Sequence, residues 1–125
     1  MLSDKEAIPM IAVRNVNDAA QFYEGTLGLA RLSNEGEEVV TYRSGKSALN
    51  VYRSKYAGTN MATALTWNVG DEIESIVAAL KSKGVLFEHY DLPGLTRSGD
   101  VHTGGKMKVA WFKDPDGNIL SLVSG

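Results

Sequence analysis

The residues of this chain that are best suited to metal or proton-transfer chemistry are its histidines. There are 2 histidines, His89 and His102, and no cysteine among the 125 residues. The lack of cysteine excludes disulfides, thiolate zinc sites, iron–sulfur clusters and a cysteine nucleophile. Any metal site must combine these imidazoles with carboxylates. Glu88 and His89 are neighbours in a predicted strand and face opposite sides, so we interpret both as structural.

The second histidine lies in a polar, glycine-rich segment, residues 91–105, and several interpretations of it stand. As part of a lid, His102 could give a proton to a bound substrate or take one from it. Alternatively, it is a solvent-exposed histidine in a loose surface loop. A metal site made of His102, Asp100 and Asp91 is a further alternative, although loop ligands without strand support make poor sites.

Patterns for nucleophilic or phosphate chemistry do not occur in the sequence. Neither histidine has an identifiable serine partner, and no GxSxG elbow or phosphate-binding loop is present. The segment 114–118, DPDGN, alternates side-chain oxygens as a calcium loop does. An EF-hand needs glycine at its sixth position and glutamate at its twelfth, whereas this chain has Ile119 and Gly125 there. We therefore predict a turn.

Composition limits the partners and the compartment. Lys and Arg number 13 and Asp and Glu 15, a formal net charge of −2, which argues against nucleic acid as a partner. There is no apolar run of about 18 residues, so neither a membrane span nor a signal peptide is predicted. We expect a single cytoplasmic domain with an ordinary packed core.

The same order of elements occurs twice along the chain: an apolar strand, an amphipathic helix that ends at glycine, and hairpin strands. In the first half the strand covers residues 8–13, and Asn17 or Asp18 is predicted to cap the helix. In the second half the strand covers residues 62–69, and Asp71 is the predicted cap. The second helix has apolar residues at i, i+3, i+4 and i+7, namely Ile73, Ile76, Val77 and Leu80.

Both halves continue with strands and therefore have the order βαβββ. The predicted strands cover residues 30–34, 37–43 and 48–53 in the first half and 85–89, 107–112 and 119–123 in the second. Module one then spans about residues 7–54 and module two about residues 61–124 of one domain, residues 1–125. The segment 91–105 has no counterpart in the first half.

Two segments carry a resemblance to a known family. With the paired modules, residues 22–29, FYEGTLGL, and residues 112–118, FKDPDGN, resemble the vicinal oxygen chelate superfamily, which includes glyoxalase I, extradiol dioxygenases, and bleomycin- and fosfomycin-resistance proteins. Residues 104–108 are also similar to a glyoxalase I segment beside the substrate. The resemblance implies an α+β fold, in which the curved mixed sheets of two βαβββ modules form a cup.

In metal-using members of this superfamily, two strand positions per module supply His, Glu or Gln ligands. Counted from the motifs, these positions fall on Met10, Asn50, Ala64 and Ser121. A thioether, an amide, a methyl group and a hydroxyl bind divalent ions far more weakly than imidazole or carboxylate ligands. We therefore expect no metal and no other cofactor.

The alternation of side chains along the strands supports this assignment of strand positions independently of the resemblance. One face is apolar throughout and should form the core: Ile11, Val13, Leu49, Val51, Leu65, Trp67, Ala110, Phe112, Leu120 and Leu122. The other face is mixed in polarity, as the wall of a ligand cup is. On that face and in the adjoining loop we predict ligand-binding residues at Met10, Thr41, Asn50, Tyr52, Thr66, His102, Met107, Trp111 and Ser121.

For the most distinctive of these residues a structural interpretation remains open. Trp111 either stacks on a ligand ring or closes the cup against neighbouring apolar side chains. Asn50 and Tyr52 either orient a polar ligand or form their hydrogen bonds with each other or with ordered water.

The predicted function is metal-free binding of a small, partly aromatic or amphipathic molecule. The resemblance implies sequestration, as in the bleomycin-resistance branch, and a homodimer. The alternative is a glyoxalase-like lyase or isomerase, or a dioxygenase, with a relocated metal site. A third possibility is a structural or regulatory partner protein, which would carry a large exposed apolar patch.

Overall fold

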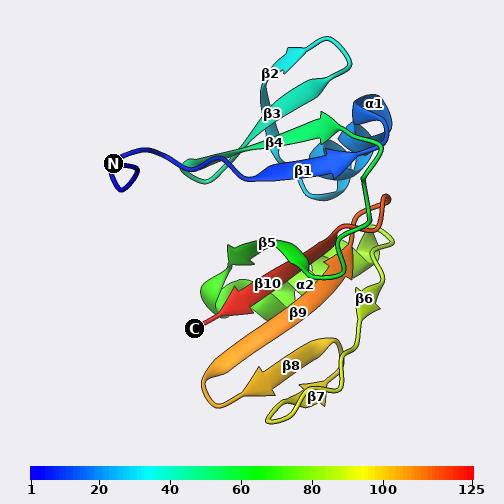
Figure 1. Ribbon diagram of the computed structural model, residues 1–125. Coiled ribbons are helices and arrows are strands. Elements are labelled where there is room, and N and C mark those ends of the chain that lie inside the picture. Colours follow the sequence, from blue (N-terminus) through cyan, green and yellow to red (C-terminus); the bar gives the residue numbers. More distant parts are fainter. The chain divides into compact units, whose positions relative to one another are not determined.

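The computed structural model describes residues 1–125 as two compact units, Met1–Gly58 and Thr59–Gly125 (Figure 1). Each unit contains one mixed sheet with a short helical segment on one face, so the predicted α+β class is correct. The longest α-helix has 10 residues, and no helix is long and apolar enough to span a membrane.

The first unit is a four-stranded sheet with the order β1-β4-β3-β2. β1 pairs with β4 in parallel, whereas the β2–β3 and β3–β4 pairs are antiparallel. Its elements are β1 (Met10–Val13), α1 (Val16–Ala20), a π-helical turn η1 (Gln21–Thr26), β2 (Ala30–Glu35), β3 (Val39–Ser44) and β4 (Ser47–Arg53). These are the predicted strands, with ends that differ by a few residues.

The helix of the first unit begins earlier than predicted. Asn15, not Asn17 or Asp18, is the N-cap, because its side-chain oxygen accepts hydrogen bonds from the backbone N–H groups of those two residues at 2.9 and 3.0 Å. Asn15, Asn17 and Asp18 all belong to residue types that are preferred at helix caps. Asn15 is the cap because β1 ends at Val13 and the chain turns directly after that strand.

A partly buried polar contact joins the helical segment of the first unit to its sheet. The Tyr42 hydroxyl on β3 donates a 2.8 Å hydrogen bond to Glu24 of η1, and Arg31 on β2 forms a 2.6 Å ion pair with the same carboxylate oxygen. Hydrogen bonds from Arg31 and Tyr42 lower the pKa of Glu24. Burial, followed by the hydrogen bond to Glu24, raises the pKa of Tyr42 to about 12.

The raised pKa of Tyr42 predicts a loss of stability at alkaline pH. Because the folded state favours the neutral phenol, its contribution is complete below the unfolded pKa of about 10 and is lost as pH rises towards 12. Ultraviolet titration of the 5 tyrosines should show a late step near this pH, and Tyr42→Phe should diminish it. Simultaneous ionisation of all the tyrosines in the folded protein would contradict this prediction.

The second unit is a larger sheet with the order β5-β10-β9-β8-β7, and β6 also pairs with β9. β5 and β10 are parallel, and the other pairs are antiparallel. Its elements are β5 (Thr63–Asn68), a 3₁₀ turn η2 (Gly70–Glu72), α2 (Ile73–Ser82), β6 (Phe87–Glu88), β7 (Thr96–Ser98), β8 (Val101–Gly104), β9 (Met107–Lys113) and β10 (Ile119–Ser124).

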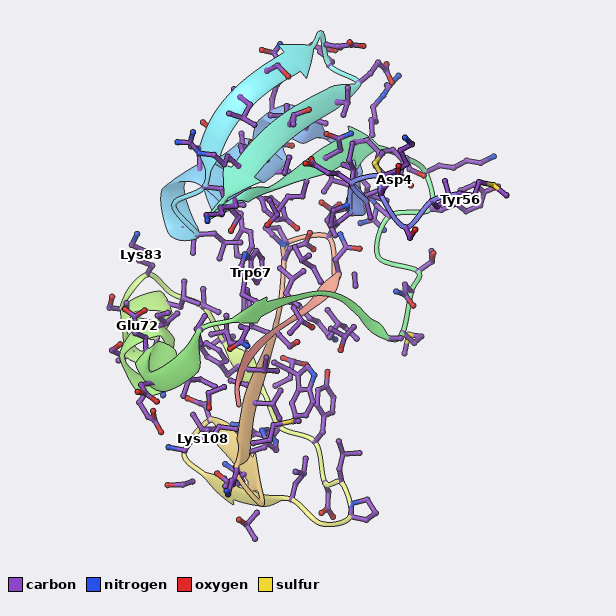
Figure 2. All side chains as sticks on the ribbon, turned by 90° about the vertical axis from the view of Figure 1, so that its left-hand side faces the viewer. Asp4, Tyr56, Trp67, Glu72, Lys83 and Lys108 are labelled. Atoms are coloured by element: carbon purple, nitrogen blue, oxygen red, sulfur yellow. The ribbon has the colours of Figure 1, made fainter.

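Helix α2 covers one face of this sheet (Figure 1). Its predicted stripe is buried at Ile73, Val77 and Leu80 and half-buried at Ile76. Figure 2 shows Lys108 of β9 on the same side of the sheet as this helix, and Lys108 forms a 2.6 Å ion pair with Glu74. The predicted cap at Asp71 is wrong, because η2 precedes the helix and no side chain caps either segment.

The predicted apolar face packs as the core in both units. Eight of its residues are buried, namely Ile11, Val13, Leu49, Val51, Ala110, Phe112, Leu120 and Leu122. Leu65 and Trp67 are only half-buried, because they lie on β5, which forms an edge of the second sheet.

Segment 91–105 is not a structureless excursion. Residues 96–104 form the β7–β8 hairpin, and β8 extends the sheet by pairing with β9. The hairpin packs closely, since a Cβ on Gly104 would lie 2.6 Å from the Leu95 side chain and 3.2 Å from the Gly94 carbonyl oxygen. Sequence analysis missed these strands because they are short and polar.

Candidate binding site in the second unit

The helix-free face of the second sheet collects several of the predicted ligand-binding residues. Strand pairing places His102 beside Val109, Met107 beside Gly104, and Ser121 between Trp111 and Thr66. Because side chains alternate along each strand, these residues share one face: Thr66, His102, Met107, Trp111 and Ser121.

Trp111 lies at the centre of this face and lines an open pocket of about 330 Å³. The indole is half-buried and meets the edge of the Tyr90 ring at a centroid distance of 5.0 Å. The lining is mainly apolar with one charged pair, and comprises Met61, Ala62, Thr63, Glu88, Tyr90, Leu92, Trp111, Lys113 and Ile119. Glu88 and Lys113 form that pair at 3.5 Å.

The alternative of an exposed loop histidine at position 102 is wrong. His102 is 1% exposed because β8 pairs with β9, which carries its ring onto the sheet. The imidazole packs edge-on against Trp111 at a centroid distance of 4.9 Å, and its Nε2 accepts a 3.1 Å hydrogen bond from the Tyr90 backbone N–H. His102, Tyr90 and Trp111 therefore form one continuous cluster.

An ion-pair network anchors the start of β8. Asp100 Oδ2 pairs with Lys81 Nζ of α2 at 2.7 Å, and Asp100 Oδ1 is hydrogen-bonded to His89 Nε2 at 2.7 Å. These hydrogen bonds, that of Lys81 first, lower the pKa of Asp100. Asp100 thus bonds His89 rather than His102, and the structure does not gather His102, Asp100 and Asp91 into a group that could hold a metal ion.

The strand register also shows which residue of β5 lies beside Ser121. Ser121 pairs with Thr66, and the ladder is irregular between Ile119 and Leu120. Ala64 is the extra residue of that irregularity, so Thr66, not Ala64, lies beside Ser121. The Thr66 and Ser121 hydroxyls are hydrogen-bonded to each other at 2.7 Å.

The remaining predicted site residues lie on the helix-free face of the first sheet. Met10 pairs with Asn50, Asn50 with Thr41, and Tyr52 with Val39. Thr41 Oγ1 donates to Asn50 Oδ1 at 2.7 Å, and Asn50 Nδ2 reaches Met10 Sδ at 3.5 Å. Asn50 is therefore bonded to Thr41 and Met10 rather than to Tyr52.

The strand positions that carry metal ligands in relatives can be tested against these contacts. Counted from the motifs, they are Met10 and Asn50 in the first unit and Ala64 and Ser121 in the second. No carboxylate or imidazole is present at any of them, and the amide and hydroxyl groups are bonded to each other or to neighbours. These residues do not fit a divalent metal ion.

The first unit has a pocket of its own, of about 430 Å³, lined by Arg14, Glu38, Arg53, Ser54 and Lys55. Arg53 and Glu38 form a 2.6 Å ion pair, and Arg14 donates to the Ala57 carbonyl at 3.3 Å. None of the predicted ligand-binding residues lines this pocket, and it contains no aromatic or aliphatic side chain. The pocket at Trp111 is the better candidate for an organic ligand.

Sequence analysis missed several lining residues of the Trp111 pocket. Lys113 lies two positions after Trp111 on β9, so strand alternation alone could have found it. Glu88, interpreted as structural, also lines the pocket, because β6 pairs Glu88 with Trp111. No local signal marks Tyr90, which follows β6 in an irregular segment.

The chain belongs to the Glyoxalase/Bleomycin resistance protein/Dioxygenase superfamily, whose family model matches residues 7–122. This is the superfamily that the sequence motifs indicated. No curated protein matches significantly.

Solved structures of this superfamily have the same fold as the chain. A glyoxalase family protein from Enterococcus faecalis is similar with a TM-score of 0.74 at 22% identity, covering 99% of this chain and 100% of that one. Lactoylglutathione lyase from Agrobacterium tumefaciens has a TM-score of 0.71 at 15% identity, covering 97% and 94%. The fosfomycin resistance protein FosX from Listeria monocytogenes has a TM-score of 0.71 at 13% identity, covering 98% and 91%.

Proposed function

We propose that this protein binds a small organic molecule with a flat apolar part, in the Trp111 pocket and without a metal ion. The observation that carries the proposal is the half-buried indole of Trp111 in an open pocket of about 330 Å³, with Tyr90 set edge-on beside it. Ligand pockets of about 300–1,000 Å³ with mainly apolar walls are typical of small-molecule sites. An aromatic ring on Trp111 would add about 0.5–1.5 kcal/mol beyond its buried area.

The charged pair at this pocket gives the ligand a polar contact. Glu88 and Lys113 lie 3.5 Å apart, and their side chains are 33% and 47% exposed, so neither is locked away from an incoming molecule. An exposed pair of this kind contributes little to stability. A ligand hydroxyl, amine or carboxylate can therefore exchange with it at low cost.

Sequestration is the mode of action that this site supports best. The pocket contains no Ser-His or Cys-His pair, and the strand positions that the resemblance assigns to metal ligands hold Met10, Asn50, Ala64 and Ser121. Binding alone protects a cell from a toxic molecule when the protein is abundant. The superfamily includes bleomycin resistance proteins, and FosX of Listeria monocytogenes is described as a fosfomycin resistance protein.

Tryptophan fluorescence tests the proposal. The chain has 2 tryptophans, so the Trp67→Phe variant leaves Trp111 as the sole reporter. We expect saturable quenching by members of a panel of small aromatic compounds, with affinity unchanged by a chelator and with no metal detected by elemental analysis of the purified protein. Near-stoichiometric metal together with loss of binding in chelator would contradict the proposal and favour a metal-dependent enzyme.

A further inference from the structure

A second pocket of about 290 Å³ adjoins the Trp111 pocket. Its lining comprises His89, Tyr90, Asp91, Leu95, Arg97 and His102. Tyr90 lines both pockets, and its ring and backbone contact Trp111 and His102 respectively. The two pockets therefore meet at Tyr90.

His102, which lines this second pocket, has a hydrogen-bond donor that no protein group uses. Its Nε2 accepts a hydrogen bond from the Tyr90 backbone N–H at 3.1 Å. In a neutral imidazole one nitrogen accepts and the other carries the proton, so the proton of His102 lies on Nδ1. This atom is buried and has no protein partner. Leaving such a donor unsatisfied is unfavourable, which makes it a candidate contact for a ligand acceptor.

The charges around the pocket define which acceptor fits. Arg97 contributes one positive charge, and only one of its N–H groups bonds protein, to the Gly99 carbonyl at 2.7 Å. Asp91 contributes one negative charge to the lining. His89 is held by Asp100, whose second oxygen is paired with Lys81. A carboxylate is planar and carries one negative charge, so it can pair with the single guanidinium of Arg97. A phosphate carries two negative charges and would be repelled more strongly by Asp91.

We infer that the ligand of this protein is an aromatic carboxylate, with its ring on Trp111 and its carboxylate on His102 Nδ1–H and the Arg97 guanidinium. The inference rests on the proposed function, because it extends the Trp111 pocket by a polar subsite. The His102 ring couples the two parts, since it packs against Trp111 at a centroid distance of 4.9 Å and also lines the second pocket.

The test is calorimetric titration of the full chain with arylalkanoic acids, such as benzoate, phenylacetate and indole-3-propionate, and with their neutral primary amides. We expect at least one acid to bind about 10-fold more tightly than its amide, which is the effect of one hydrogen bond to a charged group. Replacing the exposed Arg97 by glutamine, Arg97→Gln, should remove that preference. Arg43→Gln, an equal charge change at an exposed residue of β3, is the matched control.

A second measurement reports on His102 without replacing a buried residue. In nitrogen-15 NMR spectra, the Nδ1 and Nδ1–H signals of His102 should shift when a binding acid is added and stay unchanged with its amide. Equal affinity for acids and amides, equal effects of Arg97→Gln and Arg43→Gln, or a His102 signal unaffected by acids, as expected for a donor satisfied by water alone, would overturn the inference. If neither acids nor amides bind, the proposed function fails with it.

Discussion

Trp111→Ala is expected to weaken binding of aromatic ligands by about 30- to 150-fold. A ligand ring on the indole covers about 80–120 Å² of apolar surface, and at about 25 cal/mol per Å² the lost contact is worth 2–3 kcal/mol. The indole is already half-exposed on the open side of the sheet, so its removal leaves the opposite, helix-covered core intact. The affinity is measured by calorimetric titration with a compound that quenches Trp111.

Matched variants separate lost stacking from a damaged fold. Trp111→Phe keeps a ring and should retain most of the affinity, whereas Trp67→Phe, on the other face of the sheet, should leave the affinity unchanged. Circular dichroism should show the same secondary structure in all three variants. If Trp111→Ala binds as tightly as the wild type, the indole only closes the sheet surface and the ligand site lies elsewhere.

Asp114→Ala is expected to destabilise the protein by about 3 kcal/mol, or to lower Tm by roughly 10 °C. Asp114 is 4% exposed. Its carboxylate accepts hydrogen bonds from the backbone N–H groups of Asp116 and Asn118 at 2.9 and 2.8 Å, and from the Asn118 side chain at 2.8 Å. Alanine leaves buried donors without acceptors and loosens the turn that sets the register of β9 against β10.

Urea denaturation followed by circular dichroism measures this loss. Asp114→Asn keeps an acceptor for the backbone N–H groups but no longer satisfies the Asn118 amide, so an intermediate effect of about 1–2 kcal/mol is expected. Asp71→Ala is the control. Its side chain caps no helix, and the change should stay within about 0.5 kcal/mol. A loss for Asp114→Ala no larger than that of Asp71→Ala would show that the turn holds without its carboxylate.

Much of the fold could be predicted from the sequence because its signals are local. Strand alternation separated the buried face from the face that carries Thr66, Trp111 and Ser121, since side chains alternate sides whatever the strand pairs with. The stripe of α2 likewise follows from the helical repeat. Where a signal permitted more than one choice, as at the cap of α1, the prediction was displaced by a few residues.

The site required the tertiary structure. The sequence by itself determined that the strand positions counted from the motifs, Met10, Asn50, Ala64 and Ser121, hold no carboxylate or imidazole, and that Trp111 faces away from the helix. Only the fold decided that His102 is buried, because its burial depends on a short polar strand pairing with β9. The pocket at Trp111 combines side chains from β5, β6, β9, β10 and the segment after β6. The pocket could not be predicted from any local sequence pattern, because it is formed by contacts between residues that are far apart in the chain.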